Sequence, residues 1–521
     1  MQYDTIIIGG GHNGLTCAFY LARKGKKVLI LERHHEVGGA AFTEEFHPGF
    51  RNSVAAYTVS LLQPKVIDDM KLYEHGLEVV LRKVDNFLPY DGGYLLAGPK
   101  GLTAKEISRH SKKDAENFPL YEARLDKVVT VLKKFLLTAP PNAGGGFSDL
   151  MAALKAGRIA QKAGLETQRD LLDFFTKSAG EILDRYFENE AVKALFGFDA
   201  VVGHFASPYE PGSAYVLLHH VFGEARGVPG AWGHAIGGMG AITQAMKSAC
   251  LAAGVEIRTD SPVSKIKTEN GRASAVIAND EVIRAKQIAS SVHPKILYER
   301  LLDPADLPED FRWRMSGYKS QSGTFRMNVA LSELPKFNNA PKGEDFLTSG
   351  IIIAPSLDYM DQAWISAHSK GWSDKPIIEM LIPSTLDDSL APKGQHVASL
   401  FCQQFKFDLG KDRSWDDVRN DVANHIIKTV ERYAPGFEKS VIARQINSPL
   451  DIERRFGLIG GDIFQGAMSL DQLFSARPVL GFGAYKSPIK GLFMCGSGTH
   501  PGGGVTGAPG HNAAHVMFKR N

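Results

Sequence analysis

Residues 3–32, YDTIIIGGGHNGLTCAFYLARKGKKVLILE, contain the pattern that decides the fold. The apolar run Tyr3–Ile8 is rich in β-branched residues and predicts a buried strand. Glycines follow, Leu15–Lys24 places apolar residues at helical spacing, and Val28–Leu31 predicts a second strand that ends at Glu32. Strand, glycine turn, helix and strand in this order form the βαβ unit of a dinucleotide-binding fold.

The glycines of this unit form a G-x-G-x-x-G motif at Gly9, Gly11 and Gly14, and each has its own task. Gly9 makes the tight turn, Gly11 lets the backbone approach a pyrophosphate, and Gly14 lets the helix pack closely on the strand. The helix N-terminus offers free N–H groups and a partial positive charge to phosphates. Glu32 then predicts an acceptor for a ribose diol, and its charge disfavours a 2′-phosphate.

Two further glycine-rich stretches favour FAD over NAD. The pair Gly38-Gly39 closely follows the acid, where a flavin enzyme needs a loop that passes near the dinucleotide. The run GSGTHPGGGVTG, residues 496–507, follows an apolar strand and precedes a helix. Such a turn can present several backbone N–H groups to the negative edge of a reduced flavin. The alternative for both stretches is a purely structural glycine loop.

A resemblance to a known family covers essentially the whole chain. Its motifs are the N-terminal unit, Gly237–Gly240, the segment Ser291-Val292-His293-Pro294 and residues 496–507. The segment at Ser291 closes four short runs that predict a β-meander: Val255–Thr259, Val263–Lys267, Ala273–Ala278 and Glu281–Ala289. In this order the motifs resemble the phytoene desaturase-like FAD oxidoreductases, which include carotenoid desaturases, carotenoid isomerases and retinol saturases.

The resemblance implies an α/β fold in which a Rossmann-type FAD-binding domain, of the glutathione reductase and amine oxidase kind, is interleaved with an α+β substrate domain. We expect the FAD-binding domain in residues 1–70, 230–300 and 480–521, and the substrate domain in residues 71–229 and 301–479. The residues that the resemblance implies for the ADP half of FAD are Gly9, Gly11, Gly14, Glu32, Arg33, Gly38 and Gly39, with the Val263 backbone at the adenine. Those implied for the ribityl chain and flavin ring are Gly496, Ser497, Gly504, Val505 and Thr506. Many relatives carry an acid where this chain has Ser497, which can bond a hydroxyl but adds no charge.

The implied chemistry is desaturation of a C–C bond in an apolar, isoprenoid- or lipid-like substrate, by hydride transfer to flavin N5. The chain has no second strand, G-x-G-x-x-G and helix unit, so we expect a small electron acceptor such as oxygen or a quinone rather than NAD(P)H. His500, in the glycine-rich loop, and the pair His219 and His220 are the candidate catalytic residues, since histidine titrates near neutral pH. A loop-anchoring hydrogen bond is the alternative for His500, and a buried core position is the alternative for at least one of the pair.

Other function classes stay open at this point. A redox-neutral FAD-dependent isomerase would carry the same motifs, and so would a non-enzymic flavoprotein that acts through protein partners. An amine oxidase shares the Rossmann frame but typically places aromatic side chains near the flavin, whereas residues 496–510 contain no Phe, Tyr or Trp.

Composition excludes several other classes. The chain has 521 residues, 44% of them hydrophobic, and a net charge of +3, so bulk charge does not support a nucleic-acid partner. The four cysteines are far apart and form no CxxC motif, which argues against a disulfide scaffold, a metal site and a dithiol redox centre. Residues 1–22 lack a signal-peptide pattern and no run is long enough to span a bilayer, so a cytoplasmic protein is expected. Lys-rich helices around 127–137 and 151–162 suggest peripheral membrane contact, although solvated helices that pack on a core are the alternative.

Overall fold

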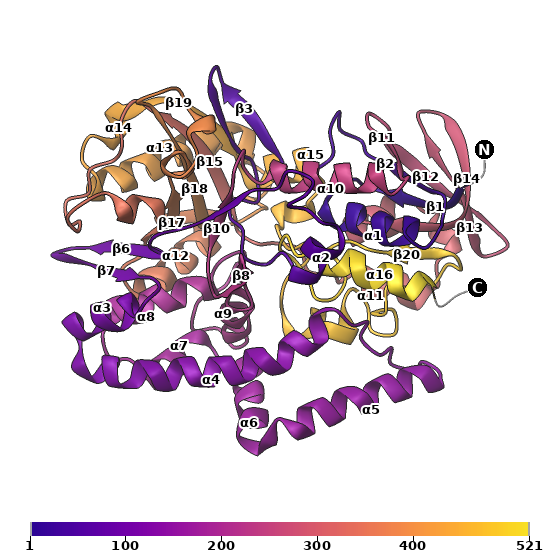
Figure 1. The fold of residues 1–521 in the computed structure, drawn as a ribbon, viewed down its shortest axis with the longest axis horizontal. Helices are drawn as coiled ribbons and strands as arrows, with labels where there is room; N and C mark the ends of the chain where they lie inside the picture. The colour runs from indigo at the N-terminus through magenta and orange to yellow at the C-terminus, as the bar shows by residue number, and fades with distance from the viewer. Residues whose placement is uncertain (1–2, 519–521) are drawn as a thin grey trace.

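The computed structural model describes residues 3–518 and contains two seven-stranded sheets (Figure 1). The first sheet has the order β11-β2-β1-β14-β13-β12, and β20 pairs with β14. Its strands are β1 (Tyr3–Ile8), β2 (Val28–Leu31), β11 (Glu256–Arg258), β12 (Val263–Glu269), β13 (Arg272–Ala278), β14 (Glu281–Ser290) and β20 (Leu492–Met494). The predicted strand, turn, helix and strand at the N-terminus is therefore confirmed, with β1 and β2 parallel.

Strand β14 takes part in both antiparallel and parallel pairing. Its first residues pair antiparallel with β13, and its last residues lie parallel to β1 on one side and β20 on the other. The predicted meander is correct for β12, β13 and β14 but wrong for the run Val255–Thr259. That run contains β11, which lies parallel to β2 at the opposite edge of the sheet. The helix before it, α10 (Gly240–Ala252), makes this crossover possible.

Helices cover both faces of this sheet. On one face pack α1 (His12–Ala22), α10 (Gly240–Ala252) and α16 (Ala508–Phe518), which share a buried core with β1 and β2. On the other face, residues of β1 and β2 share a second core with residues of β12 and β13 and with α11 (Glu309–Ser316). The strands are thus buried on both sides, which is why β1 and β2 consist of nearly continuous apolar residues.

The second sheet has the order β19-β15-β18-β17-β16-β6-β7. Helix α13 (Trp415–Tyr433) packs against one face, and α12 (Leu357–Lys370) and α8 (Glu190–Gly197) pack against the other. The strands are β6 (Asn86–Tyr90), β7 (Gly93–Ala97), β15 (Phe325–Leu331), β16 (Gly350–Ile353), β17 (Trp372–Leu381), β18 (His396–Phe405) and β19 (Val441–Asn447). Shorter elements are β3 (Thr43–His47), β4 (Phe50–Ser53), α2 (Pro64–Asp69), β5 (Val79–Leu81), β8 (Glu224–Ala225), β9 (Val228–Pro229), β10 (Gly233–Ala235), α14 (Phe437–Ser440) and α15 (Pro449–Phe456).

A group of helices lies beside the second sheet (Figure 1). They are α3 (Leu102–His110), α4 (Lys112–Leu136), α5 (Phe147–Lys162), α6 (Gly164–Thr176), α7 (Ala179–Asp184), α8 (Glu190–Gly197) and α9 (Ser213–Val221). The apolar stripe of α4 is not free for a membrane, since Val128 and Val131 are buried and Leu132 packs against the core. Within residues 3–518 no helix is long and apolar enough to cross a bilayer.

Candidate functional site

A cavity extends from the glycine turn between β1 and α1 to the second sheet. Its lining on the side of the parallel sheet includes Gly9, Gly11, His12, Asn13, Glu32, Arg33, Gly39, Val263, Ser291, Ser497, Gly504 and Val505. Its lining on the other side includes residues 55–62, Val202, His220, Trp232, Phe401 and residues 463–465. The cavity therefore joins the predicted cofactor motifs to residues of the second sheet and its helices.

The glycine turn has the tight geometry that its motif predicts. Gly9 has a φ of +96°, and a Cβ on Gly14 would lie 2.1 Å from the Gly9 carbonyl oxygen. Helix α1 thus approaches the turn too closely for a side chain at Gly14. The Gly11 position is different, because a Cβ there would meet nothing closer than 3.9 Å, at Gly38 and Gly39.

The pair Gly38-Gly39 lies directly against this turn. The Gly38 backbone N–H donates to the Gly10 carbonyl oxygen at 3.1 Å, and Gly38 and Gly11 form an isolated β-bridge. Gly38 and Gly39 have φ values of +150° and +56°. Two glycine loops therefore meet backbone to backbone, and Gly9, Gly11 and Gly39 from them line the cavity.

Glu32 directly follows β2, lines the cavity and is 4% exposed. Its Oε2 accepts a hydrogen bond from the Gly10 N–H at 2.6 Å, and its Oε1 accepts one from the His34 N–H at 3.0 Å. These two bonds fix the orientation of the carboxylate. Arg33 and Val263 also line this end, and the Arg33 Nη2 donates to the Arg455 carbonyl oxygen at 2.6 Å.

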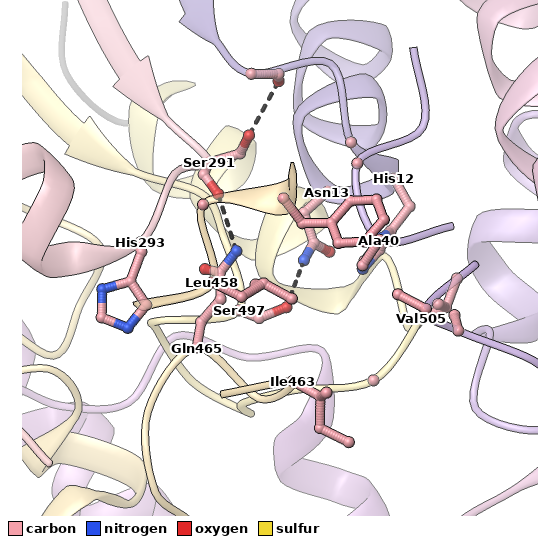
Figure 2. Close-up of a pocket in the computed structure, with 18 of the residues that line it drawn as sticks. His12, Asn13, Ala40, Ser291, His293, Leu458, Ile463, Gln465, Ser497 and Val505 are labelled. Carbon is pink, nitrogen blue, oxygen red and sulfur yellow. Dashed lines mark hydrogen bonds between the residues drawn. The ribbon is translucent and has the colours of Figure 1, made fainter. Parts of the chain in front are cut away.

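The C-terminal loop reaches the N-terminus of α1 through Ser497. Figure 2 shows this contact, in which the Asn13 Nδ2 donates to the Ser497 Oγ at 3.0 Å. Two neighbouring polar atoms, Asn13 Oδ1 and His12 Nε2, are buried without a partner, and both residues line the cavity. Unpaired polar atoms beside an open glycine turn fit a polar ligand such as the diphosphate and ribityl chain of FAD.

Other predicted residues of the C-terminal loop lie behind the lining. A Cβ on Gly496 would lie 2.4 Å from the Ser291 carbonyl oxygen, so this position keeps the loop tight against the end of β14. The Thr506 Oγ1 accepts a hydrogen bond from the Ala508 N–H at 3.1 Å at the start of α16. Gly504 and Val505 do line the cavity.

The structure separates the three candidate histidines. His220 lines the cavity, and its Nδ1 donates to the Val216 carbonyl oxygen at 2.9 Å. His219 on the same helix does not line it; its ring lies edge-on to Phe464 at 5.6 Å. His500 also lies outside the lining, with its Nε2 donating to the Phe135 carbonyl oxygen at 3.0 Å. Burial lowers the pKa of His220 to about 4, so its imidazole is neutral near pH 7.

The apolar wall of the cavity comes largely from residues that sequence analysis did not select. It includes Tyr57, Leu61, Val202, Trp232, Phe401, Ile463 and Phe464. The only available signal was the apolar run at residues 54–62, which no motif distinguishes from core. Phe198 and Phe222, two of the aromatic residues between positions 196 and 222, belong to the core of the helical group and do not line the cavity.

A cluster of ionisable groups lies behind the Tyr57 wall. The Tyr57 hydroxyl donates to Glu379, and the Arg326 guanidinium lies over the Tyr57 ring at 4.9 Å. Burial raises the pKa of Glu379, and the charges of Arg82 and Arg326 oppose that rise. These groups hold the Tyr57 ring in place at the cavity wall.

Arg477 is a second positioning residue that no motif indicated. It is fully buried, and it donates only to backbone carbonyl oxygens. Its Nη2 reaches the carbonyl oxygens of Phe464 at 2.8 Å and Ser497 at 3.0 Å. It therefore joins the segments at Phe464 and Ser497, which both line the cavity.

The four cysteines lie outside the lining of the cavity. All four are buried, and none lines the cavity. Cys17 and Cys495 approach one another in the core, and contact with Cys17 together with burial raises the pKa of Cys495 well above its ordinary value. Protonated, buried thiols do not support disulfide exchange.

The parallel sheet, the glycine turn, the acid at the end of β2 and the cavity beyond them define an FAD-binding flavoprotein of the oxidoreductase class. The model of the family described as flavin containing amine oxidoreductase matches residues 14–324, and the chain belongs to that family. FAD is accordingly its cofactor, and the expected Rossmann-type α/β fold is confirmed.

The chain is 40% identical to the rat protein named pyridine nucleotide-disulfide oxidoreductase domain-containing protein 2, over 99% of this chain and 94% of the relative. It is 26% identical to a limonene dehydrogenase component of Castellaniella defragrans, over 99% and 94% of the two chains. It is 24% identical to 4,4'-diapolycopen-4-al dehydrogenase of Metabacillus indicus, over 96% and 93%. A solved structure of putrescine oxidase aligns over 100% of both chains with a TM-score of 0.59 at 15% identity, which shows the shared fold. The resemblance to the carotenoid oxidoreductases is thus confirmed.

Proposed function

We propose that this protein desaturates a C–C bond of an apolar, isoprenoid- or lipid-like substrate, with oxygen or a quinone as the final electron acceptor. When bound, FAD supplies the hydride-accepting chemistry. The residues of the chain bind and orient the substrate, keep water out and take the proton that leaves the adjacent carbon.

The main support for this proposal is that the cavity wall is apolar and uncharged. Among the described lining residues at 55–62, 202, 220, 232, 401 and 463–465, none is Asp, Glu, Lys or Arg. Apolar side chains such as Leu61, Phe401 and Ile463 predominate. A protonated amine would meet no carboxylate on this wall, whereas a hydrocarbon would be desolvated by it.

The names of the relatives support the same substrate class. Two of them are named for limonene and for 4,4'-diapolycopen-4-al. Sequence identity near 25% does not transfer a substrate, so these names add to the argument from the wall and do not replace it.

We assign proton transfer to His220. The Val216 carbonyl can only accept, so in the neutral ring His220 Nδ1 carries the proton and Nε2 is the basic nitrogen. A neutral imidazole at the cavity wall can take the proton from the carbon next to the one that loses hydride. One C–H bond then breaks as hydride and its neighbour as a proton, and the two electrons left behind form the C=C bond. In this proposal His219 helps to position the cavity wall at Phe464, and His500 helps to position the glycine-rich C-terminal loop.

In the same proposal, Gly9, Gly11, Glu32, Arg33, Gly39 and Val263 hold the ADP half of FAD, and Ser497, Gly504 and Val505 lie along its ribityl and flavin end. Gly14, Gly38, Gly496 and Thr506 shape the backbone behind them. The unpaired Asn13 Oδ1 and His12 Nε2 are additional contacts of this chain.

An anaerobic visible spectrum of the purified protein, before and after addition of a lipid extract from its host, tests the proposal. Loss of the oxidised flavin bands supports substrate oxidation, and fractionation of the extract then isolates the substrate. Bound flavin that stays oxidised while the extract changes composition would instead identify a redox-neutral isomerase. Flavin that stays oxidised with no change in the extract would favour a flavoprotein that acts through partners.

A further inference from the structure

Helix α5 (Phe147–Lys162) buries none of its residues, although several of its largest side chains are apolar. Phe147, Leu150, Met151 and Leu154 are 77%, 56%, 47% and 51% exposed. They recur at the spacing i, i+3, i+4 and i+7, so they form one stripe along one face of the helix. We call these four residues the outer stripe. Such a stripe normally faces a protein core, and here it faces solvent.

The opposite face of α5 holds the helix to the protein. Ala152, Ala156 and Ala160 recur at i, i+4 and i+8, and all three are half-buried. The Gln168 Nε2 of α6 donates to the Ala160 carbonyl oxygen at 3.1 Å. In Figure 1, α5 lies at the edge of the molecule, beyond α4 and away from both sheets. The helix is therefore held with small side chains inward and large apolar ones outward.

The segment that leads into α5 is anchored as well. Asn142 accepts a hydrogen bond at its Oδ1 from the Ala484 N–H at 3.0 Å, which ties this segment to the C-terminal part of the chain. Whatever binds the outer stripe is thus held in a defined orientation to the rest of the molecule.

The charges beside the outer stripe are all positive. Lys155, Arg158 and Lys162 are exposed along its edge, and no ion pair found within residues 3–518 neutralises them. The one acid of the helix, Asp149, is half-buried on the inner face, where its Oδ1 accepts from the Asn142 N–H at 3.0 Å. An apolar face bordered by free cations is complementary to a surface that is apolar inside and anionic at its rim.

We propose that α5 docks in the plane of a membrane surface that contains anionic lipids. The outer stripe enters the boundary between headgroups and acyl chains, and Lys155, Arg158 and Lys162 contact the phosphates. A second copy of the chain is a poorer occupant, because a twofold interface would bring these cations against their own equivalents with no acid on the same face. This inference goes beyond the proposed function and does not depend on the substrate or on catalysis.

Flotation of the holoprotein with vesicles tests the proposal without any substrate. We expect it to float with vesicles of phosphatidylcholine and phosphatidylglycerol, and poorly with phosphatidylcholine alone. The double variant F147E/L154E should bind the anionic vesicles at least about tenfold more weakly, since charge replaces buried apolar surface. K155Q/R158Q should lose the preference for anionic lipid. The matched control L251E changes a leucine of α10 that is also 51% exposed, and it should float like the wild type.

A labelled variant reports on the stripe itself. The four native cysteines are buried, so Met151→Cys adds one accessible thiol for a polarity-sensitive dye. Its emission should shift to the blue on anionic vesicles, and the flavin spectrum of each variant checks that the protein is folded. Wild-type protein that stays unbound, or F147E/L154E that floats unchanged, would overturn the proposal. Light scattering that shows a dimer split by F147E/L154E, without vesicle binding, would assign the stripe to a protein interface instead.

Discussion

At the scale of single residues, the site depends on a few buried polar groups whose partners are backbone atoms. Glu32 is held by two backbone N–H groups, and Arg477 donates to carbonyl oxygens of loops that are distant in sequence. His220 is similarly oriented by the Val216 carbonyl oxygen. Because backbone atoms are the partners, no further polar side chain is needed to orient these three groups. The cavity wall can therefore consist of apolar side chains.

Glu32→Ala should weaken FAD binding by about ten- to a hundredfold, since a charged hydrogen-bond acceptor contributes about 1.5–3 kcal/mol. The substitution removes the acceptor proposed for the ribose and leaves the Gly10 N–H unpaired. Flavin fluorescence titration of the apoprotein measures the change. Glu74→Ala, at an exposed residue paired with Lys71, is the control and should bind FAD normally. Equal affinity in both variants would show that Glu32 has no part in the cofactor site.

His220→Ala should lower the rate of flavin reduction by about a hundredfold or more, because general-base catalysis contributes about 10²–10⁴. Its flavin content should stay unchanged, since the hydrogen bond of His220 is made within its own helix, to the Val216 carbonyl oxygen. Stopped-flow reduction with the isolated substrate provides the measurement. His368→Ala, at an exposed histidine of α12 outside the lining, is the control and should reduce flavin at the wild-type rate. An H220A rate equal to that of the wild type would remove His220 as the proton acceptor.

At the scale of elements, the close approach of α1 to the first turn sets the geometry of the cofactor end. The Gly14 position has no room for a side chain, and the neighbouring glycine loop lies against the same turn. Helix α5 is the opposite case, because little packs against it and its outer stripe is exposed.

Gly14→Ala should lower the free energy of unfolding by about 1–3 kcal/mol and release FAD, because the added Cβ lies 2.1 Å from the Gly9 carbonyl oxygen. Thermal and urea unfolding, with and without added FAD, measure both effects. Gly157→Ala on α5 is a control with open space around it, and it should stabilise by about 0.5–1 kcal/mol through helix propensity. A stable G14A variant that retains flavin would contradict the packing argument.

At the scale of the whole molecule, the site forms where residues of the two sheets meet at one cavity. The folded protein also buries many histidines. Burial lowers the pKa of His12, His204, His219, His220, His293 and His500 to about 4 or about 3. In the unfolded chain these groups titrate near 6.5. Burial raises the pKa of Asp199 to about 8 and those of Asp85 and Asp462 to about 6, so these three carboxyls act in the opposite sense.

We expect stability to fall as the pH drops from about 6.5 to about 4. In this window the unfolded histidines bind protons that the folded ones do not, so protonation favours the unfolded state. The three carboxyls bind protons mainly in the folded state and reduce this effect, but six histidines outnumber them. Thermal unfolding at pH 7 and pH 4.5 measures the change, for both apoprotein and holoprotein. A melting temperature that is equal or higher at pH 4.5 would contradict the buried, neutral state of these histidines.

The sequence by itself determined the βαβ unit, the glycine turn, Glu32 and the FAD class, because these depend on local periodicity and on backbone conformations that only glycine adopts readily. The strand at Val255–Thr259 was placed in the wrong arrangement, since a short apolar run does not specify which sheet edge it joins. Only the tertiary structure decided that His220 faces the cavity while His219 does not, and that Arg477 connects the loops at Phe464 and Ser497. The same holds for the apolar wall and for the outward stripe of α5. Which way a side chain points is set by the packing of segments that lie far apart in the chain, and no local pattern encodes that approach.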